Sequence, residues 1–136
     1  MVNKINKPEP PTDDTDFEIR FYESLIEKKS DFVEALAALG DLYTKKGFYE
    51  KGLIVDEKLA TLRPDDAIVL YNLACSYSLV NNLDKALRTI KQAVECGYDN
   101  LDHLNQDPDL LNLRKDSRFR RYFLKITADN QSKPSV

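Results

Sequence analysis

Two stretches of the chain repeat each other at an interval of 34 residues. Residues 33–66 align with residues 67–100 without a gap. Large apolar and small residues recur in that alignment: the pairs are Leu36 with Leu70, Leu39 with Leu73, Gly40 with Ala74, Tyr43 with Tyr77, Gly52 with Ala86 and Leu59 with Ala93. Self-similarity at a period of roughly 20–50 residues indicates an array in which each unit buries its apolar face against the next. The chain is therefore expected to fold as a stack of repeated units.

The apolar residues between the two ends of the chain follow the spacing of α-helices. Leu70, Leu73, Ala74, Tyr77 and Val80 stand at i, i+3, i+4, i+7 and i+10, which places them on one helix face. No segment of useful length alternates apolar and polar residues as a strand does. We therefore expect an all-α fold of about seven helices, near residues 16–29, 32–46, 49–62, 67–80, 83–96, 108–114 and 117–126.

The composition is that of a globular chain with few groups for metal or nucleic-acid chemistry. Hydrophobic residues make up 42% and charged residues 32%, and a net charge of -3 does not suit a general nucleic-acid binder. Cys75 and Cys96 lie far apart without a cluster of further ligands, so reduced thiols are expected and a zinc site is not. No apolar run reaches the length of a membrane span, and residues 1–16 lack the apolar core of a signal peptide. We therefore expect a cytoplasmic protein without a metal, a cofactor or a membrane partner.

The repeated pattern resembles the tetratricopeptide repeat (TPR) family, whose 34-residue unit places large apolar, small and aromatic residues at fixed positions. In the first unit these positions hold Leu36, Leu39, Gly40, Tyr43, Gly52, Asp56, Leu59 and Pro64. In the second unit they hold Leu70, Leu73, Ala74, Tyr77, Ala86, Ile90, Ala93 and Tyr98. The resemblance implies an α-solenoid, a superhelical stack of antiparallel helix pairs whose axes approach closely at the small residues.

Three residues depart from the family pattern. Asp56 stands where an aromatic residue usually packs, Leu59 where alanine is usual, and Tyr98 where proline is usual. Burying a polar group without a partner is costly, and a lone charge more so. We therefore expect the Asp56 side chain to turn toward solvent or to meet a tyrosine hydroxyl.

The resemblance extends beyond the two full units. Tyr22 and Leu25 occupy the aromatic and small positions of a preceding second helix, and the C-terminal part resembles the degenerate closing repeat of many bacterial members. These features imply a bacterial source and a C-terminal cap. The expected organisation is a disordered tail at 1–15, a single domain at 16–126 made of a half repeat at 16–32, full repeats at 33–66 and 67–100 and a degenerate cap at 101–126, and a second disordered tail at 127–136.

The sequence contains no catalytic constellation. It lacks G-x-S-x-G, G-x-G-x-x-G and H-E-x-x-H motifs and a phosphate-binding loop. The acidic run from Asp99 to Asp109 fails as a calcium loop because Leu101 and His103 take ligand positions and the central glycine is missing. We interpret the run as a capped turn before a helix that begins at Asp107 and Pro108, and His103 as a surface residue. The protein is therefore expected not to be an enzyme.

The resemblance implies a binding groove lined by the first helix of each pair. The positions that face this groove in the family are here Glu34, Ala37, Ala38, Asp41, Lys45, Ile68, Tyr71, Asn72, Cys75 and Leu79. Asn72 matches a position whose amide holds the ligand backbone, since a carboxamide both donates and accepts hydrogen bonds. The alternative is that Asn72 only faces water or caps a neighbour. Ala37 and Asp41 replace the lysine and asparagine with which chaperone-binding members hold a C-terminal carboxylate, so anionic tails are expected to be disfavoured. The apolar groove residues, together with Glu34 and Asp41, predict a ligand that is apolar with some positive charge.

A second candidate surface lies in residues 114–125, which carry six cations and one aspartate. Arg118, Arg121 and Lys125 recur there at helical spacing. They are interpreted either as a solvated face that balances an acidic body or as a contact for an acidic partner or RNA.

The leading hypothesis is a non-catalytic module that binds a protein or peptide partner in its concave groove. The alternative is a structural protein that self-associates through the open ends of its solenoid. The chain is accordingly expected to be a monomer or a weak homo-oligomer.

Overall fold

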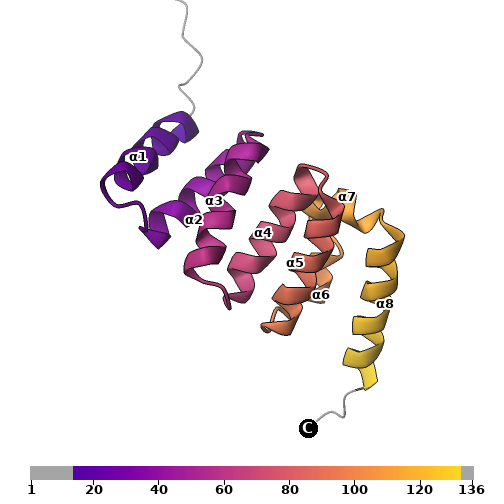
Figure 1. Ribbon diagram of the computed structural model, residues 1–136. Coiled ribbons are helices and arrows are strands. Elements are labelled where there is room, and N and C mark those ends of the chain that lie inside the picture. The colour runs from indigo at the N-terminus through magenta and orange to yellow at the C-terminus, as the bar shows by residue number, and fades with distance from the viewer. Residues whose placement is uncertain (1–13, 133–136) are drawn as a thin grey trace, which may run out of the picture.

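The computed structural model describes residues 14–132, and its helices follow one another in a single row (Figure 1). In chain order they are α1 (Asp14–Lys28), α2 (Val33–Lys45), α3 (Tyr49–Leu62), α4 (Ala67–Leu79), α5 (Leu83–Glu95), α6 (Leu101–Leu104), the 3-10 helix η2 (Pro108–Leu110), α7 (Leu111–Arg114) and α8 (Ser117–Ser132). The described residues form no strand, and the predicted all-α class is confirmed.

The first five helices begin and end within two residues of their predicted bounds, and the differences lie toward the C-terminus. The single turn of α6 is absent from the predicted helices, because four residues are too few to show a periodicity. The helix predicted at 108–114 is divided into η2 and α7.

Both predicted tails are shorter than the sequence indicated. α1 already begins at Asp14, and α8 continues to Ser132 through residues predicted as a disordered tail. The hydroxyl of Thr127 donates to the carbonyl oxygen of Phe123, four residues earlier, at 2.9 Å. This bond lies inside α8, so the helix does not end at Thr127. The rest of the predicted tails, residues 1–13 and 133–136, lies outside the described residues.

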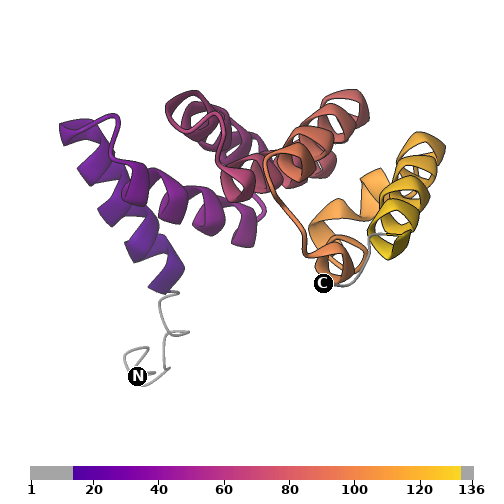
Figure 2. The same cartoon turned by 90° about the horizontal axis from the view of Figure 1, so that it is seen from below.

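Consecutive helices pack against each other from α1 to α5. The closing segment, which runs from α6 to α8 (Leu101–Ser132), then folds back. η2 and α7 contact α4, while α8 packs on α7, so the stack ends in a bent arrangement (Figure 2). The buried side chains of the closing segment belong to the same apolar cluster as those of α4 and α5; they are Leu104, Leu110, Leu113 and Phe119. The segment thereby covers apolar surface that a regular third unit would otherwise cover.

Small residues stand where the helices meet, as the sequence predicted. Ala74, Ala86 and Ala93 are completely buried. At Gly40 in α2, an added Cβ would lie 2.7 Å from Oδ1 of Asp56 in α3. The two helices are therefore closer at Gly40 than any side chain would permit.

The 34-residue period is also visible in the turns between the helices of each pair. Gly47 and Asn81, which are one period apart, both have positive φ, 82° and 65°. Glycine and asparagine tolerate this left-handed conformation better than other residues. Each turn ends with the same backbone bond, from Phe48 N–H to Tyr43 O at 2.8 Å in one and between the equivalent residues at 2.9 Å in the other.

A repeated side-chain bond places α1 within the period. The Tyr43 hydroxyl donates to Glu23 Oε2 at 2.6 Å, and the Tyr77 hydroxyl donates to Glu57 Oε2 at 2.8 Å. Glu23 in α1 and Glu57 in α3 are one period apart, so α1 occupies the place of a second helix in its unit.

The expectation for Asp56 is wrong. The side chain is buried, with 6% of its surface exposed, and its partner is the Ser76 hydroxyl at 2.5 Å and not a tyrosine. The serine lies on α4, so the bond joins the two full units through their interior. The sequence could not reveal this pairing, because it depends on how closely α3 and α4 pack.

Replacing Gly40 with alanine is expected to destabilise the fold by about 1–3 kcal/mol. In an exposed helix the same change would stabilise by about 1 kcal/mol. Here the new methyl group would overlap the buried Asp56 carboxylate, which Ser76 holds in place. Urea denaturation followed by circular dichroism measures the difference.

Gly52→Ala is the matched control, since the atoms nearest to its Cβ would be the Thr44 hydroxyl at 3.3 Å and Tyr43 Cβ at 3.6 Å, neither as close as the 2.7 Å contact at Gly40. This variant should be neutral or more stable than the wild type. Equal effects at Gly40 and Gly52 would show that the approach of α2 and α3 does not restrict the side chain at Gly40.

Candidate binding groove

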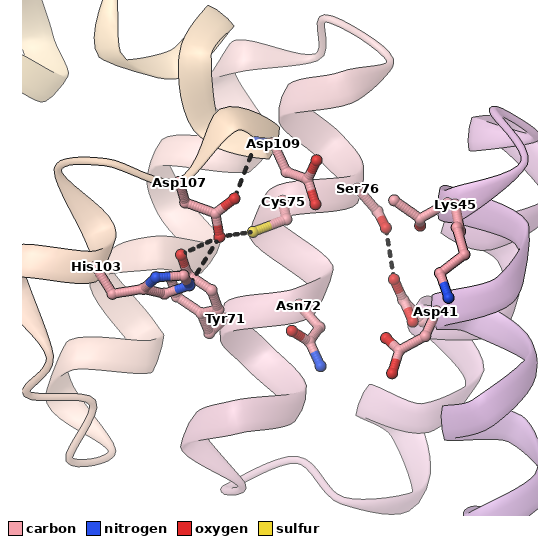
Figure 3. Close-up of a pocket in the computed structure, with 11 residues that line it drawn as sticks. Asp41, Lys45, Tyr71, Asn72, Cys75, Ser76, His103, Asp107 and Asp109 are labelled. Carbon is pink, nitrogen blue, oxygen red and sulfur yellow. Dashed lines mark hydrogen bonds and ion pairs between the residues drawn. The ribbon is translucent and has the colours of Figure 1, made fainter.

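A hollow of ≈ 330 Å³ lies between α2, α4 and the segment that joins α6 to η2 (Figure 3). Its lining residues come from α2, α3, α4 and the stretch from α6 to η2: they are Asp41, Thr44, Lys45, Asp56, Tyr71, Asn72, Cys75, Ser76, His103, Asp107 and Asp109. α2 and α4 are the first helices of the two full units. The hollow thus lies on the face where the sequence predicted a groove.

The structure brings half of the predicted groove residues into this hollow, namely Asp41, Lys45, Tyr71, Asn72 and Cys75. Ile68 lies beside it, in a neighbouring hollow that shares Tyr71, Asn72 and His103 with the first. The four others are outside both hollows: Glu34 and Ala37 are exposed, while Ala38 and Leu79 are half-buried. Whether any of these residues binds a ligand remains a prediction.

Asp107 connects the closing segment to α4. Its Oδ2 accepts a hydrogen bond from the Tyr71 hydroxyl at 2.6 Å and a weaker one from Cys75 Sγ at 3.8 Å. The same oxygen lies 3.2 Å from Nε2 of His103. Its Oδ1 accepts from the backbone N–H of Asp109 at 3.0 Å, which is the predicted cap. Figure 3 shows these side chains converging on Asp107.

Tyr71 and Cys75, which the resemblance placed in the groove, line the hollow and direct their polar atoms to Asp107. Both are buried, and the Tyr71 ring stacks on Tyr98 with 4.3 Å between ring centroids and 7° between planes. Tyr98, which stands where the resemblance places a proline, thus packs its ring against α4. His103, interpreted from the sequence as a surface residue, has a half-exposed ring that also contacts Asp107.

Only partial signals in the sequence point to the residues that the prediction missed. Asp107 is recognisable as a helix cap, but nothing in its spacing indicates that Tyr71 reaches it from 36 residues away. Asp109 lies two residues beyond Asp107 and enters the hollow because η2 turns it toward α4.

The hollow is acidic, since Asp41, Asp56, Asp107 and Asp109 face only Lys45 and His103. Burial raises the pKa of Asp56 to about 7; Ser76 opposes this and Asp41 adds to it. Burial also raises the pKa of Asp109, as do the neighbouring charges of Asp107 and Asp41. The pKa of Asp41 is raised as well, because burial has a larger effect than the charge of Lys45, which lowers it. A cation in the hollow would therefore replace protons and stabilise the ionised carboxylates.

The groups in the hollow are not arranged as a nucleophilic centre. Burial, followed by the charges of Asp107 and Asp109, raises the pKa of the Cys75 thiol, whereas a reactive cysteine needs a lowered pKa. His103 contacts Asp107, so the carboxylate and not the imidazole meets the thiol. Among residues 14–132, no group of three or more histidine, cysteine or acidic side chains is placed to hold a metal ion.

The predicted basic surface lies at the start of α8 and is partly engaged. Arg118 Nη1 lies 2.7 Å from Asp84 Oδ1 on α5, and Nη2 lies 2.8 Å from Asp116 Oδ2. Its hydrogen bonds lower the pKa of Asp116 to about 2. Arg118 thus ties α8 to its neighbours, while Arg121 and Lys125 are exposed.

None of the described helices has the length and apolar character needed to cross a membrane.

Comparison with known proteins supports the fold. No family model matches the chain. A chloroplastic protein of Arabidopsis thaliana is 32% identical over 80 residues, which cover 57% of this chain and 24% of that protein. The match thus spans about a quarter of the relative's length. The solved structure of MamA 41-end from Desulfovibrio magneticus RS-1 superposes with a TM-score of 0.70 at 19% identity, over 90% of this chain and 70% of that one.

MamA is a TPR-containing protein, so the chain has a TPR-like solenoid fold, as the sequence predicted. One matched protein comes from a plant and the other from a bacterium, so the bacterial source and the cytoplasmic location stay predictions.

The stability of the protein is expected to fall as the pH rises from about 4 to about 7 because of Asp56. The pKa of Asp56 is raised in the folded state, so folding favours the proton and opposes the charge. Asp56→Asn cannot ionise. Its stability relative to the wild type should therefore increase across this range by up to about 4 kcal/mol. Urea denaturation of both proteins at several pH values measures the change, and a difference that does not vary with pH would contradict the assignment.

Tyr71→Phe is expected to destabilise the protein by about 1–3 kcal/mol, because it removes a donor from a buried carboxylate oxygen. Tyr122→Phe is the control, since Tyr122 packs its ring on the same apolar cluster but is less buried. Thermal and urea denaturation should show a clear loss only for Tyr71→Phe. Equal stability of the two variants would mean that Asp107 does not hold the closing segment.

Proposed function

We propose that this chain is a non-catalytic scaffold whose groove binds an extended, apolar segment of a partner protein and places a lysine or arginine of that segment in the acidic hollow. The observation that carries the proposal is the excess of carboxylates around the hollow. A cationic side chain is the peptide group that best compensates them. An acidic C-terminal tail would instead meet Asp41 and Asp109.

The two adjoining hollows supply the other contacts that a peptide needs. Asn72 lines both of them and is half-buried, so its amide is available to one peptide unit of a ligand. Ile68 is 59% exposed beside the second hollow, where Tyr98 also lies. These residues support a binding mode in which the backbone meets Asn72, an apolar side chain covers Ile68, and a cation enters the first hollow.

The rigidity of the site supports binding without rearrangement. Asp107 joins α4 to η2, and Ser76 joins α4 to Asp56, so the walls are fixed to one another in the unbound protein. A preformed groove loses little conformational entropy when a peptide binds. The lack of an activated nucleophile described above favours interaction over catalysis.

Fluorescence anisotropy with two labelled peptides of equal length tests the proposal, one alternating lysine with leucine and one alternating glutamate with leucine. The lysine peptide should bind more tightly, and its affinity should rise from pH 5 to pH 8 as Asp56, whose pKa is raised to about 7, loses its proton. Preference for the glutamate peptide would overturn the proposal.

Substitutions locate the binding site. Asn72→Ala and Asp109→Asn should each weaken the lysine peptide by about threefold to tenfold, which corresponds to one lost hydrogen bond or ion pair. Glu50→Gln removes an exposed charge from α3, away from the hollow, and should leave the affinity unchanged. Equal loss in all three variants would indicate non-specific attraction to an acidic surface.

A further inference from the structure

The exposed face of α1 corresponds to a face that is buried in the other units. One period along the chain from Phe21 stands Val55 in α3, and two periods along stands Thr89 in α5. These equivalents are 8% and 5% exposed, whereas Phe21 is 49% exposed. Phe17, one turn earlier on α1, is 66% exposed, but its equivalents Lys51 and Lys85 are exposed too, so Phe21 alone carries the comparison with the other units. α1 is therefore a second helix whose pairing face has no first helix against it within the described residues.

Glu18 shows what kind of surface would fit against this face. Its equivalents in the following units are Gly52 and Ala86, both buried where a second helix meets its first helix. A Cβ at Gly52 would lie 3.6 Å from Tyr43 Cβ of α2. A carboxylate at this position is incompatible with an ordinary apolar helix at that distance. It requires a partner that brings a cation to the centre of the contact.

The opposite end of the row presents such a surface. α1 and α8 lie at the two ends in both views (Figures 1 and 2). Leu124 on α8 is 68% exposed and borders a largely apolar hollow of ≈ 290 Å³, together with Phe119, Phe123, Arg114 and Arg120. The hollow offers space for an aromatic ring and is lined in part by two arginines. The Arg114 guanidinium already donates to the carbonyl oxygen of Asp107, and the exposed Arg120 donates to that of Lys115.

The two end helices are complementary in length and charge. α1 has 15 residues, and its five carboxylates and two cations give a net charge of -3. α8 has 16 residues, and its four cations and one aspartate give a net charge of +3. Contacts between opposite potentials steer association and exclude pairing of like ends, so neither α1 with α1 nor α8 with α8 is favoured.

We propose that this chain associates with further copies of itself head to tail, with the Phe17 and Phe21 face of α1 in one copy packed on the Leu124 face of α8 in the next. A phenylalanine of α1 enters the hollow beside Phe123, and Glu18 meets Arg120 or Arg121. The contact is heterologous, so it leaves one free end of each kind and continues until a ring closes or a filament grows. It involves the ends of the stack and not the groove, so it is independent of the proposed ligand binding.

Sedimentation velocity of the full chain from micromolar to millimolar concentration tests the proposal at low and high salt. The average mass should rise with concentration at low salt and fall when salt is added. One variant reverses the α1 face (Asp14→Lys with Glu18→Lys), and another reverses the α8 face (Arg120→Glu with Arg121→Glu). Each alone should weaken association by about tenfold or more.

The decisive measurement is a mixture of the two variants in equal amounts. The reversed α1 face then meets a reversed α8 face, and the unchanged faces meet each other, so association should return. Glu50→Lys with Asp65→Lys is the control: it changes the net charge as much as the α1 reversal but alters exposed residues away from the α1 and α8 faces, and it should associate like the wild type. Circular dichroism confirms that each variant is folded.

A chain that stays monomeric at every concentration overturns the proposal. So does association that survives in both variants, or that is weakened in one of the two variants and unchanged in the other. Failure of the mixture to associate while both variants are folded would also exclude a head-to-tail contact.

Discussion

The helices of this chain come together at residues with almost no side chain, and the rest of the structure depends on that closeness. Gly40 admits α3 so near to α2 that the Asp56 carboxylate fills the space a methyl group would need. Ala74 and Ala86 are completely buried at the equivalent contact of the next unit. Because the axes are close, side chains reach across to the next unit, as Ser76 does to Asp56 and Tyr77 to Glu57. A stack of weakly stable pairs thereby becomes one connected array.

The closing segment ends this array by a different means. A third regular pair is replaced by short turns, whose leucines cover the apolar surface of α4 and α5. The Tyr71 hydroxyl donates to Asp107 and so attaches these turns to α4. A side-chain hydrogen bond thus adds to the attachment that helix packing alone provides between the other helices. The same arrangement gathers Asp109 and Asp107 near Asp41 and Asp56. The acidity of the groove is thus linked to the way in which the stack is closed.

A linear array of repeats has two unlike ends. The outer face of each terminal helix has no neighbouring repeat against it, so it is a place where further contacts can form. In this chain the groove is acidic along its inner surface, while the ends carry opposite charges on α1 and α8. The groove and the ends offer separate kinds of contact. If the two proposals hold, a partner in the groove would leave both ends of the stack free to join other copies of the chain.

The fold was largely readable from the sequence, and the site only in part. The 34-residue spacing of residues such as Leu36, Gly40 and Tyr43 determined the helix pairs, because each position has the same neighbours in every unit. The resemblance to the TPR family, and not the spacing, implied that Asp41 and Asn72 face a groove, and both line the acidic hollow. It failed for Asp56, whose partner is set by the distance between two helices, and for α6, whose single turn has no period.

What the sequence determined by itself is everything that repeats: the helices, their order, their turns and the face that each presents. What only the tertiary structure decided is the pairing of residues that do not repeat, above all Tyr71, Cys75 and His103 with Asp107. Periodicity encodes contacts between equivalent positions, since these recur at a constant offset. A contact between an array and its irregular end has no such offset, and it becomes visible only when the chain has folded back on itself.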